Sequence, residues 1–174
     1  LFDAAPVPQD LQSAPTPEEA PPVAPQVADA EAQEAVAATR ELVVVDTSVE
    51  NYQQLIDDLQ QNAGPERLLE VVLIDATGDG VQQLTDILRE RIDLDAIHII
   101  SHGSDQGFRL GDVWVTSASL ADYAGVIAEW GSALSATGDI LLYGCDLAEN
   151  AQGQQLVSGL AALTGADFSS SVDP

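Results

Sequence analysis

The chain contains HIISHGSDQG at residues 98–107 and DILLYGCDLAEN at residues 139–150. Each stretch is a hydrophobic run that stops at a reactive side chain beside a glycine, His102 in the first and Cys145 in the second. In open α/β sheets, ligands bind outside the carboxyl ends of parallel strands. If the two runs form neighbouring parallel strands, both reactive groups leave the same edge of one sheet. We therefore expect His102 and Cys145 to share a site.

Hydrophobic runs of strand length alternate with amphipathic helical patterns in the rest of the chain from residue 41 onward. Short continuous apolar runs are typical of strands that are buried on both faces. Helices between such strands make right-handed crossovers and hence a parallel sheet. The sequence predicts an α/β fold, a three-layer sandwich with a mostly parallel sheet and helices on both faces. The expected strands are Leu42–Asp46, Leu69–Asp75, Ala96–Ser101, Asp139–Tyr143 and Ala166–Ser170.

Start signals locate the expected helices. A capping box at Thr47-x-x-Glu50, a cap at Asp79 and a cap at Ser117 are expected to begin the first three helices. A small two-stranded excursion is expected over residues 107–116. The fourth helix is expected over Asn150–Leu163. The side chains expected to face the sheet are Tyr52, Leu55, Ile56 and Leu59; Val81, Leu84 and Leu88; Leu120, Tyr123, Ile127 and Trp130; and Leu156, Leu160 and Leu163.

The first 40 residues have a different composition from the remainder. Residues 1–40 contain seven of the nine prolines and no glycine. Such a segment cannot bury enough apolar surface to offset its ordering entropy, so we expect a mostly disordered linker, with a short polar helix over Asp29–Arg40. Residues 41–174 are expected to form the folded domain. The absence of methionine favours a fragment or a processed form, and an end just after the last expected strand favours truncation at the C-terminus.

The charge of the chain excludes some classes of partner. Five arginines and no lysine stand against 29 acidic residues, giving a formal charge of -24. This field repels nucleic acid and anionic membranes, and no apolar run is long enough to insert into a membrane. It attracts calcium and basic peptide segments, although acidity can also serve solubility alone. Acidic loops such as Asp75 to Asp79 lack EF-hand spacing, so we expect no metal site and hold calcium only as a weak alternative.

The two reactive residues together favour nucleophilic chemistry. Cysteine attacks as the thiolate, and His102 is the histidine placed to accept its proton near neutral pH. The backbone N–H groups of Gly103 and Cys145 could form an oxyanion hole. The alternatives are that Cys145 is a small buried hydrophobic residue and that His102 is structural. His98, four residues upstream and in mid-strand, is expected to be a structural or hydrogen-bonded core histidine.

At this point the sequence resembles a known group of enzymes. A strand ending in His-Gly, followed about forty residues later by a strand ending in Cys, resembles the caspase-like cysteine peptidases. More closely, HIISHGSDQGFRLGDVWVT and GDILLYGCDLAENAQGQQLVSGLAALTGADFSSS resemble a domain of unknown function near the N-terminus of very large exported bacterial surface proteins with cadherin-like or calcium-binding repeats. The resemblance covers residues 41–174. The start Leu1-Phe2-Asp3-Ala4-Ala5 is similar to a segment that follows Leu-Glu-Pro-Arg in such proteins.

The resemblance implies a role for each candidate residue. His102 would be the general base and acid, Cys145 the nucleophile, and the amides of Gly103 and Cys145 the oxyanion hole. Asp46, at the end of the first strand, would bind a substrate arginine before the cleaved bond, or it merely caps the helix after its strand. The chain departs from the family in two places: Tyr143 stands where some relatives have a second acid, and Tyr-Gly-Cys-Asp replaces Gln-Ala-Cys.

Two functions follow as hypotheses. The first is a secreted or cell-surface bacterial cysteine endopeptidase, without a cofactor, that cleaves a peptide or its own polypeptide within a larger repeat-containing chain. The second is a non-catalytic module of the same fold that serves secretion, docking or adhesion. A reactive thiol at Cys145 favours the enzyme, and an inert thiol favours the module.

Overall fold

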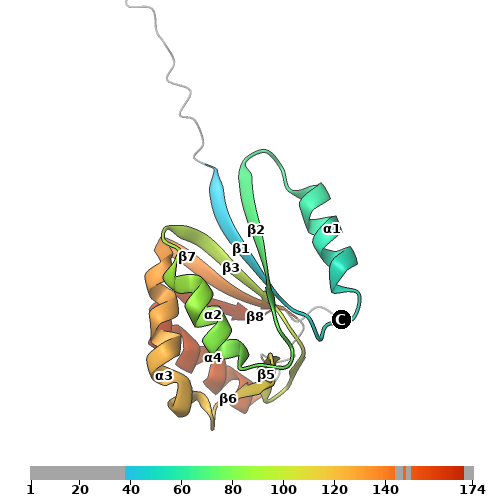
Figure 1. Cartoon of the computed structure of the whole chain (residues 1–174). Helices are drawn as coiled ribbons and strands as arrows, with labels where there is room; N and C mark the ends of the chain where they lie inside the picture. The colour runs from blue at the N-terminus through green and yellow to red at the C-terminus, as the bar shows by residue number, and fades with distance from the viewer. Residues whose placement is uncertain (1–37, 144–146, 148–149, 171–174) are drawn as a thin grey trace, which may run out of the picture. The chain divides into compact units, whose positions relative to one another are not determined.

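The computed structural model describes residues 38–143, 147 and 150–170 (Figure 1). Residues 1–37 of the predicted linker, Cys145 and the C-terminal residues 171–174 lie outside this described part. The elements are β1 Thr39–Asp46, α1 Tyr52–Asn62, β2 Arg67–Ile74, α2 Gly80–Arg89, β3 Leu94–Ile100, β4 Gly103–Ser104, β5 Gly107–Leu110, β6 Val113–Thr116, α3 Leu120–Ala128, the 3-10 helix η1 Glu129–Ala133, β7 Leu134–Tyr143, α4 Ala151–Thr164 and β8 Asp167–Ser170.

The main sheet has five strands in the order β2-β1-β3-β7-β8, and every neighbouring pair is parallel. A small antiparallel sheet is formed by β4, β5 and β6. The predicted α/β fold with a parallel sheet is therefore confirmed. The predicted excursion over residues 107–116 is the β5–β6 hairpin, while β4, which adds a third strand to it, does not follow from the sequence pattern.

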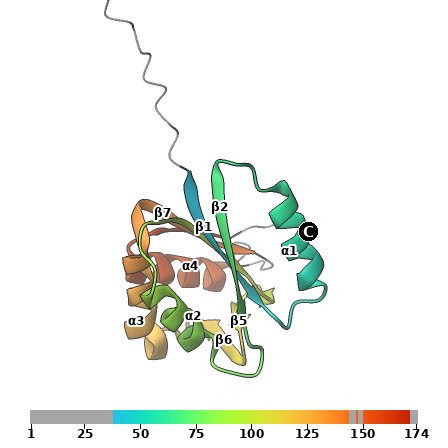
Figure 2. The same cartoon turned by 45° about the horizontal axis from the view of Figure 1, so that its top comes forward.

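The two faces of the main sheet are covered to different extents. One face packs against α2, α3 and α4 and forms a continuous core in which every central strand contributes fully buried side chains. Fully burying one such side chain is worth roughly 1.5–3 kcal/mol. The opposite face carries α1 alone among the described helices, as Figures 1 and 2 show. The central strands contribute Leu42, Val44, Ile97, Ile99, Ile140 and Leu142 to this core.

Helix α2 follows the prediction closely. Its N-cap is Asp79, whose carboxylate accepts a hydrogen bond of 2.9 Å from the backbone N–H of Gln82. The stripe of Val81, Leu84 and Leu88 is buried in the core. This pattern is typical of a helix that presents one apolar face to a sheet.

Helix α1 begins differently from the prediction. Its N-cap is Asn51 in the left-handed conformation, with φ 57°, and no side chain caps it, so the predicted capping box is wrong. The Thr47 hydroxyl instead donates to the Ile74 carbonyl at 3.0 Å and accepts from the Ala76 N–H at 3.2 Å. It is used to join the ends of β1 and β2. No residue of α1 is fully buried, so the helix packs only loosely on its face of the sheet.

Two further boundaries differ from expectation. Helix α3 has its N-cap at Ser119, not at Ser117, because the Ser119 hydroxyl closes the turn after β6 through the Thr116 N–H at 2.9 Å. The short helix predicted to reach Arg40 is wrong at its end, since β1 already includes Thr39 and Arg40. The Thr39 N–H donates to the Glu66 carbonyl at 2.9 Å, which starts the β1–β2 ladder.

The tip of the β5–β6 hairpin docks against the start of α2. Gly111 has φ 65°, and the Asp112 N–H donates to the Gly78 carbonyl at 2.9 Å. A Cβ atom at Gly80 would lie 2.3 Å from the backbone carbon of Leu110. Glycine is therefore required at this contact, where two backbones approach more closely than any side chain allows.

Candidate functional site

Strands β1, β3 and β7 end side by side at the carboxyl edge of the main sheet. Val45 pairs with Ile100, and Ile100 pairs with Tyr143. The Ser101 N–H reaches the Tyr143 carbonyl at 3.5 Å, so the register continues one step past β3. His102 and Cys145 each follow a member of the Ile100–Tyr143 pair by two positions in the sequence. The strand adjacency on which the expected site depends is therefore present, while Cys145 itself lies outside the described residues.

His102 is exposed and lies just beyond β3. Its Nε2 atom is 2.9 Å from the carbonyl oxygen of Ser48, in the turn after β1. A carbonyl oxygen only accepts hydrogen bonds, so Nε2 carries the proton and, in the neutral ring, Nδ1 is the basic nitrogen. The His102 carbonyl accepts from the Arg109 N–H at 2.7 Å, which fixes the backbone. The ring is therefore oriented by Ser48, and the backbone that carries it is held by Arg109 of β5.

Gly103, the second residue predicted for the oxyanion hole, is half-buried in β4 and pairs with Phe108 of β5. The small antiparallel sheet therefore holds the His102–Gly103 segment in an extended conformation at the carboxyl edge. An oxyanion hole also needs the amide of Cys145, and this role stays a prediction.

Asp46 is fully buried at the end of β1. Its Oδ1 atom accepts from the Ser48 N–H at 2.8 Å, and its Oδ2 atom accepts from the Gly111 N–H at 2.7 Å. The carboxylate therefore ties the turn after β1 to the tip of the β5–β6 hairpin. Such bonds to backbone N–H groups agree with the alternative that Asp46 has a structural role, although they close a turn and do not cap a helix. The substrate-binding role stays a prediction.

A polar network that sequence reasoning missed crosses the sheet on the α1 face. The Arg67 guanidinium donates to both carboxylate oxygens of Glu41, with 2.8 Å between Nε and Oε1. His98 Nε2 lies 2.9 Å from Glu41 Oε2, and His98 Nδ1 lies 3.0 Å from the Tyr143 hydroxyl. Because a carboxylate accepts only, neutral His98 carries its proton on Nε2, and Nδ1 accepts from Tyr143. The expectation of a hydrogen-bonded core histidine at position 98 is confirmed.

The surroundings of the network lower the pKa of Glu41 and raise the pKa of Tyr143. The hydrogen bonds from Arg67 are the main cause that lowers the pKa of Glu41 from 4.5 to about 2; burial opposes this shift and the bond from His98 supports it. Burial raises the pKa of the Tyr143 hydroxyl, and the charge of Glu41 raises it further. At neutral pH the network therefore consists of the ionised carboxylate of Glu41, the bridging imidazole of His98 and the protonated phenol of Tyr143.

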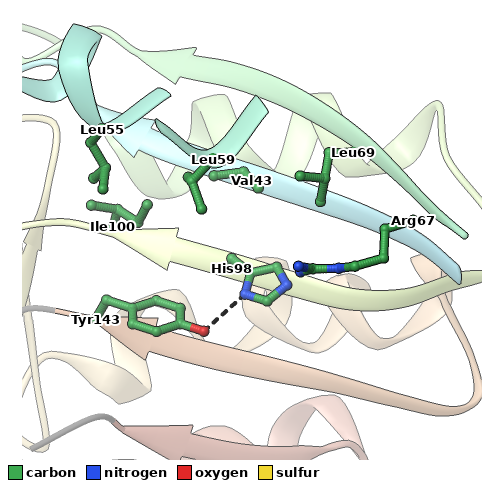
Figure 3. A pocket seen from close by; sticks show the side chains of 8 residues that line it. All are labelled: Val43, Leu55, Leu59, Arg67, Leu69, His98, Ile100 and Tyr143. Carbon is green, nitrogen blue, oxygen red and sulfur yellow. Dashed lines mark hydrogen bonds between the residues drawn. The ribbon is translucent and has the colours of Figure 1, made fainter. Parts of the chain in front are cut away.

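A pocket lies beside this network, between α1 and the sheet (Figure 3). Its volume is about 230 Å³, and most of its lining is aliphatic. Leu55 and Leu59 project from α1 toward the strands, and the Tyr143 hydroxyl and Arg67 both point to His98. We call it the α1 pocket; its lining residues are Val43, Leu55, Leu59, Arg67, Leu69, His98, Ile100 and Tyr143.

The sequence holds only a weak signal for this network. Glu41 directly precedes a run of buried aliphatic residues, and a carboxylate that is about 10% exposed requires partners. Its partners are 26 and 57 residues away along the chain, so only the strand register identifies them.

Within the described residues, no group of three or more histidine, cysteine, aspartate or glutamate side chains is placed to hold a metal ion. In the same part of the chain, none of the helices combines the length and the apolar character that crossing a bilayer would require.

The fold and its carboxyl-edge site define the class: a parallel α/β domain with a histidine displayed at the end of a central strand. The chain belongs to the family described as domain of unknown function DUF4347, whose model matches residues 42–174. No curated protein and no solved structure matches the chain.

Proposed function

We propose that the chain is a caspase-like cysteine endopeptidase in which His102 is the general base and Cys145 the nucleophile. The observation that supports this most directly is the pairing of Ile100 with Tyr143 on adjacent parallel strands, two positions before each candidate residue. Adjacent strands lie about 4.8 Å apart, so residues leaving their ends can act on one carbonyl group. Its setting would be a large exported bacterial surface protein, with its own polypeptide or another peptide as substrate.

The proposed reaction begins with proton transfer. His102 Nδ1 accepts the thiol proton of Cys145, and the thiolate attacks the scissile carbonyl carbon to form a tetrahedral intermediate. The N–H groups of Gly103 and Cys145 stabilise its oxyanion. As the C–N bond breaks, the His102 imidazolium gives its proton to the leaving amine. Water, deprotonated by His102, then hydrolyses the thioester and restores the thiol.

Specificity for arginine is a separate proposal that rests on Asp46. The carboxylate is fully buried and bonded to the backbone of Ser48 and Gly111. Pairing with a substrate guanidinium would require the hairpin tip at Gly111 to move aside. Asp46→Asn would retain the side-chain volume and remove the charge, so it should reduce cleavage after arginine and spare cleavage after an uncharged residue if the proposal holds.

Intact-mass spectrometry tests the peptidase. The polypeptide with its natural flanking residues is incubated as wild type, Cys145→Ala and His102→Ala, with and without calcium, and each is also offered arginine-containing peptides. We expect cleavage by the wild type. The cleavage rate should fall at least about 10³-fold in each of the two variants. Equal cleavage rates in all three proteins, or no cleavage by any of them, would contradict the proposal that the chain is a cysteine endopeptidase.

The second candidate is a non-catalytic module for secretion, docking or adhesion. The observation that favours it is Asp46, whose buried bonds are those of a structural residue. The rate of iodoacetamide alkylation separates the two candidates, because a catalytic thiolate reacts near neutral pH far faster than an inert thiol. A Cys145 that reacts no faster than free cysteine, and equally in His102→Ala, would support the module.

A further inference from the structure

We propose that the α1 pocket binds a small uncharged ligand with an apolar body and one hydroxyl group, such as a phenol. The site is distinct from the proposed peptidase site, because neither His102 nor Asp46 lines the pocket. The lining residues named above belong to the described part of the chain, and the proposal does not depend on the chemistry of Cys145.

The walls of the pocket select an apolar body. Among the described residues, five aliphatic side chains line it, and Leu55 and Leu59 belong to a helix with no fully buried residue. The apolar face of α1 therefore still has surface to bury, and a ligand between helix and sheet would gain about 25 cal/mol for each Å² removed from water. The five side chains are Val43, Leu55, Leu59, Leu69 and Ile100.

The volume limits the size of the ligand. An apolar cavity of about 150 Å³ stays dry and accommodates benzene. The α1 pocket, at about 230 Å³, is large enough for one aromatic ring with a substituent, or for a short aliphatic chain. It is too small to enclose a fused multi-ring cofactor or a nucleotide, whose pockets fall at roughly 300–1,000 Å³.

The polar end of the pocket selects a hydroxyl group. Tyr143 donates to His98 Nδ1, and a phenolic oxygen that donates one hydrogen bond is also an acceptor. The Arg67 guanidinium has five N–H donors, and the two hydrogen bonds described for it both go to Glu41. Figure 3 shows the Tyr143 hydroxyl and Arg67 converging on His98. A ligand hydroxyl at this end can donate to Tyr143 and accept from Arg67.

Charge complementarity requires the ligand to be neutral. The positive charge of Arg67 is already compensated by Glu41, which stays ionised because its pKa is lowered to about 2. An anion would meet an already paired guanidinium and the field of a chain with formal charge -24. A cation would lose hydration among aliphatic walls, and no carboxylate stands among the described lining residues to replace it.

The test is a titration with phenol, benzene and benzoate, followed by methyl chemical shifts of the full chain in NMR. We expect saturable binding of phenol, with the largest shifts at Val43, Leu69 and Ile100, weaker binding of benzene, and no binding of benzoate. Tyr143→Phe should weaken phenol binding by about 2- to 12-fold and leave benzene unchanged, which is the range for one net hydrogen bond. This variant retains the ring and the stacking on His98.

Leu59→Trp fills the pocket from the α1 side and should reduce phenol binding by at least about 10-fold. Ile92→Trp is the matched control, since Ile92 is 66% exposed and lies outside the pocket. Absence of saturable phenol binding to the wild type, shifts confined to other residues, or equal affinities for phenol and benzene would overturn the proposal. These readouts use the wild type alone, so a variant that fails to fold does not prevent the decision.

Discussion

Glu41 is the residue on which the polar network depends, because its carboxylate binds both Arg67 and His98. A buried carboxylate is costly unless charge and hydrogen bonds compensate it. Here the Arg67 guanidinium supplies the charge. The His98 imidazole, which Glu41 fixes in one tautomer, in turn binds the Tyr143 hydroxyl and holds it in place. The end of β7, two residues before the candidate nucleophile, is thereby held by side-chain contacts as well as by the ladder.

The pKa of Glu41 makes stability depend on acid pH. Its pKa in the folded chain, about 2, lies below the ordinary value of 4.5, so its contribution is complete above pH 4.5 and is lost as the pH falls toward 2. The shift corresponds to about 3–4 kcal/mol as an upper limit. Glu41→Gln should therefore lower the free energy of urea unfolding near pH 7 and make it less sensitive to acid.

The control for this prediction is Glu129→Gln. Glu129 pairs with Arg89 on the surface, where an ion pair contributes little to stability. The free energy of unfolding of this variant should therefore follow that of the wild type both near pH 7 and in acid. The acid titration of the other carboxylates is common to all three proteins. If Glu41→Gln and the wild type lose stability in parallel between about pH 5 and 3, the network does not hold Glu41 as described.

The contacts of individual residues show how far the structure can be predicted from the sequence. The apolar runs around Leu42, Ile99 and Leu142 predict the strands and their parallel direction, because burial on both faces leaves a visible pattern. The bond from His98 to Glu41 spans 57 residues, and its existence depends on which strands are neighbours. His102 was predicted at a strand end and is found there, whereas the contacts of Asp46 depend on a hairpin tip 65 residues away.

At the scale of elements, the junction between α2 and the β5–β6 hairpin leaves no space for a side chain. Gly80 and Gly111 meet there, backbone against backbone, and an isolated bridge joins Asp79 to Gly111. The Asp46 carboxylate accepts from the same Gly111. The hairpin that continues from the His102–Gly103 segment is therefore anchored at its far end by the start of α2 and the end of β1.

Gly80→Ala should destabilise the domain by about 1–3 kcal/mol, because the added methyl group would collide with the backbone of Leu110 and force the hairpin to shift. The measurement is urea unfolding followed by circular dichroism. Gly125→Ala is the matched control: Gly125 lies within α3 and has open space around it, so alanine should stabilise by up to about 1 kcal/mol. Equal effects of the two substitutions would contradict the close approach at Gly80.

At the scale of the whole folded domain, the two faces of the sheet are protected unequally. Helix α2 buries its apolar stripe in the continuous core, whereas α1 has no fully buried residue and borders a pocket. Local opening costs less where few apolar contacts are broken. We expect the amides of α1 to exchange with deuterium at least about 10-fold faster than those of α2 at neutral pH. Similar protection in both helices would show that α1 is packed as firmly as the core helices.

The arginine ion pairs have a consequence for encounter rates. Arg67, Arg89 and Arg91 are each bonded to carboxylates of the same chain, so their charges are compensated at short range. What a partner experiences at a distance is the field of the uncompensated acidic residues, in a chain of formal charge -24. Such a field accelerates the diffusional approach of cationic partners and slows that of anionic ones, and salt weakens both effects.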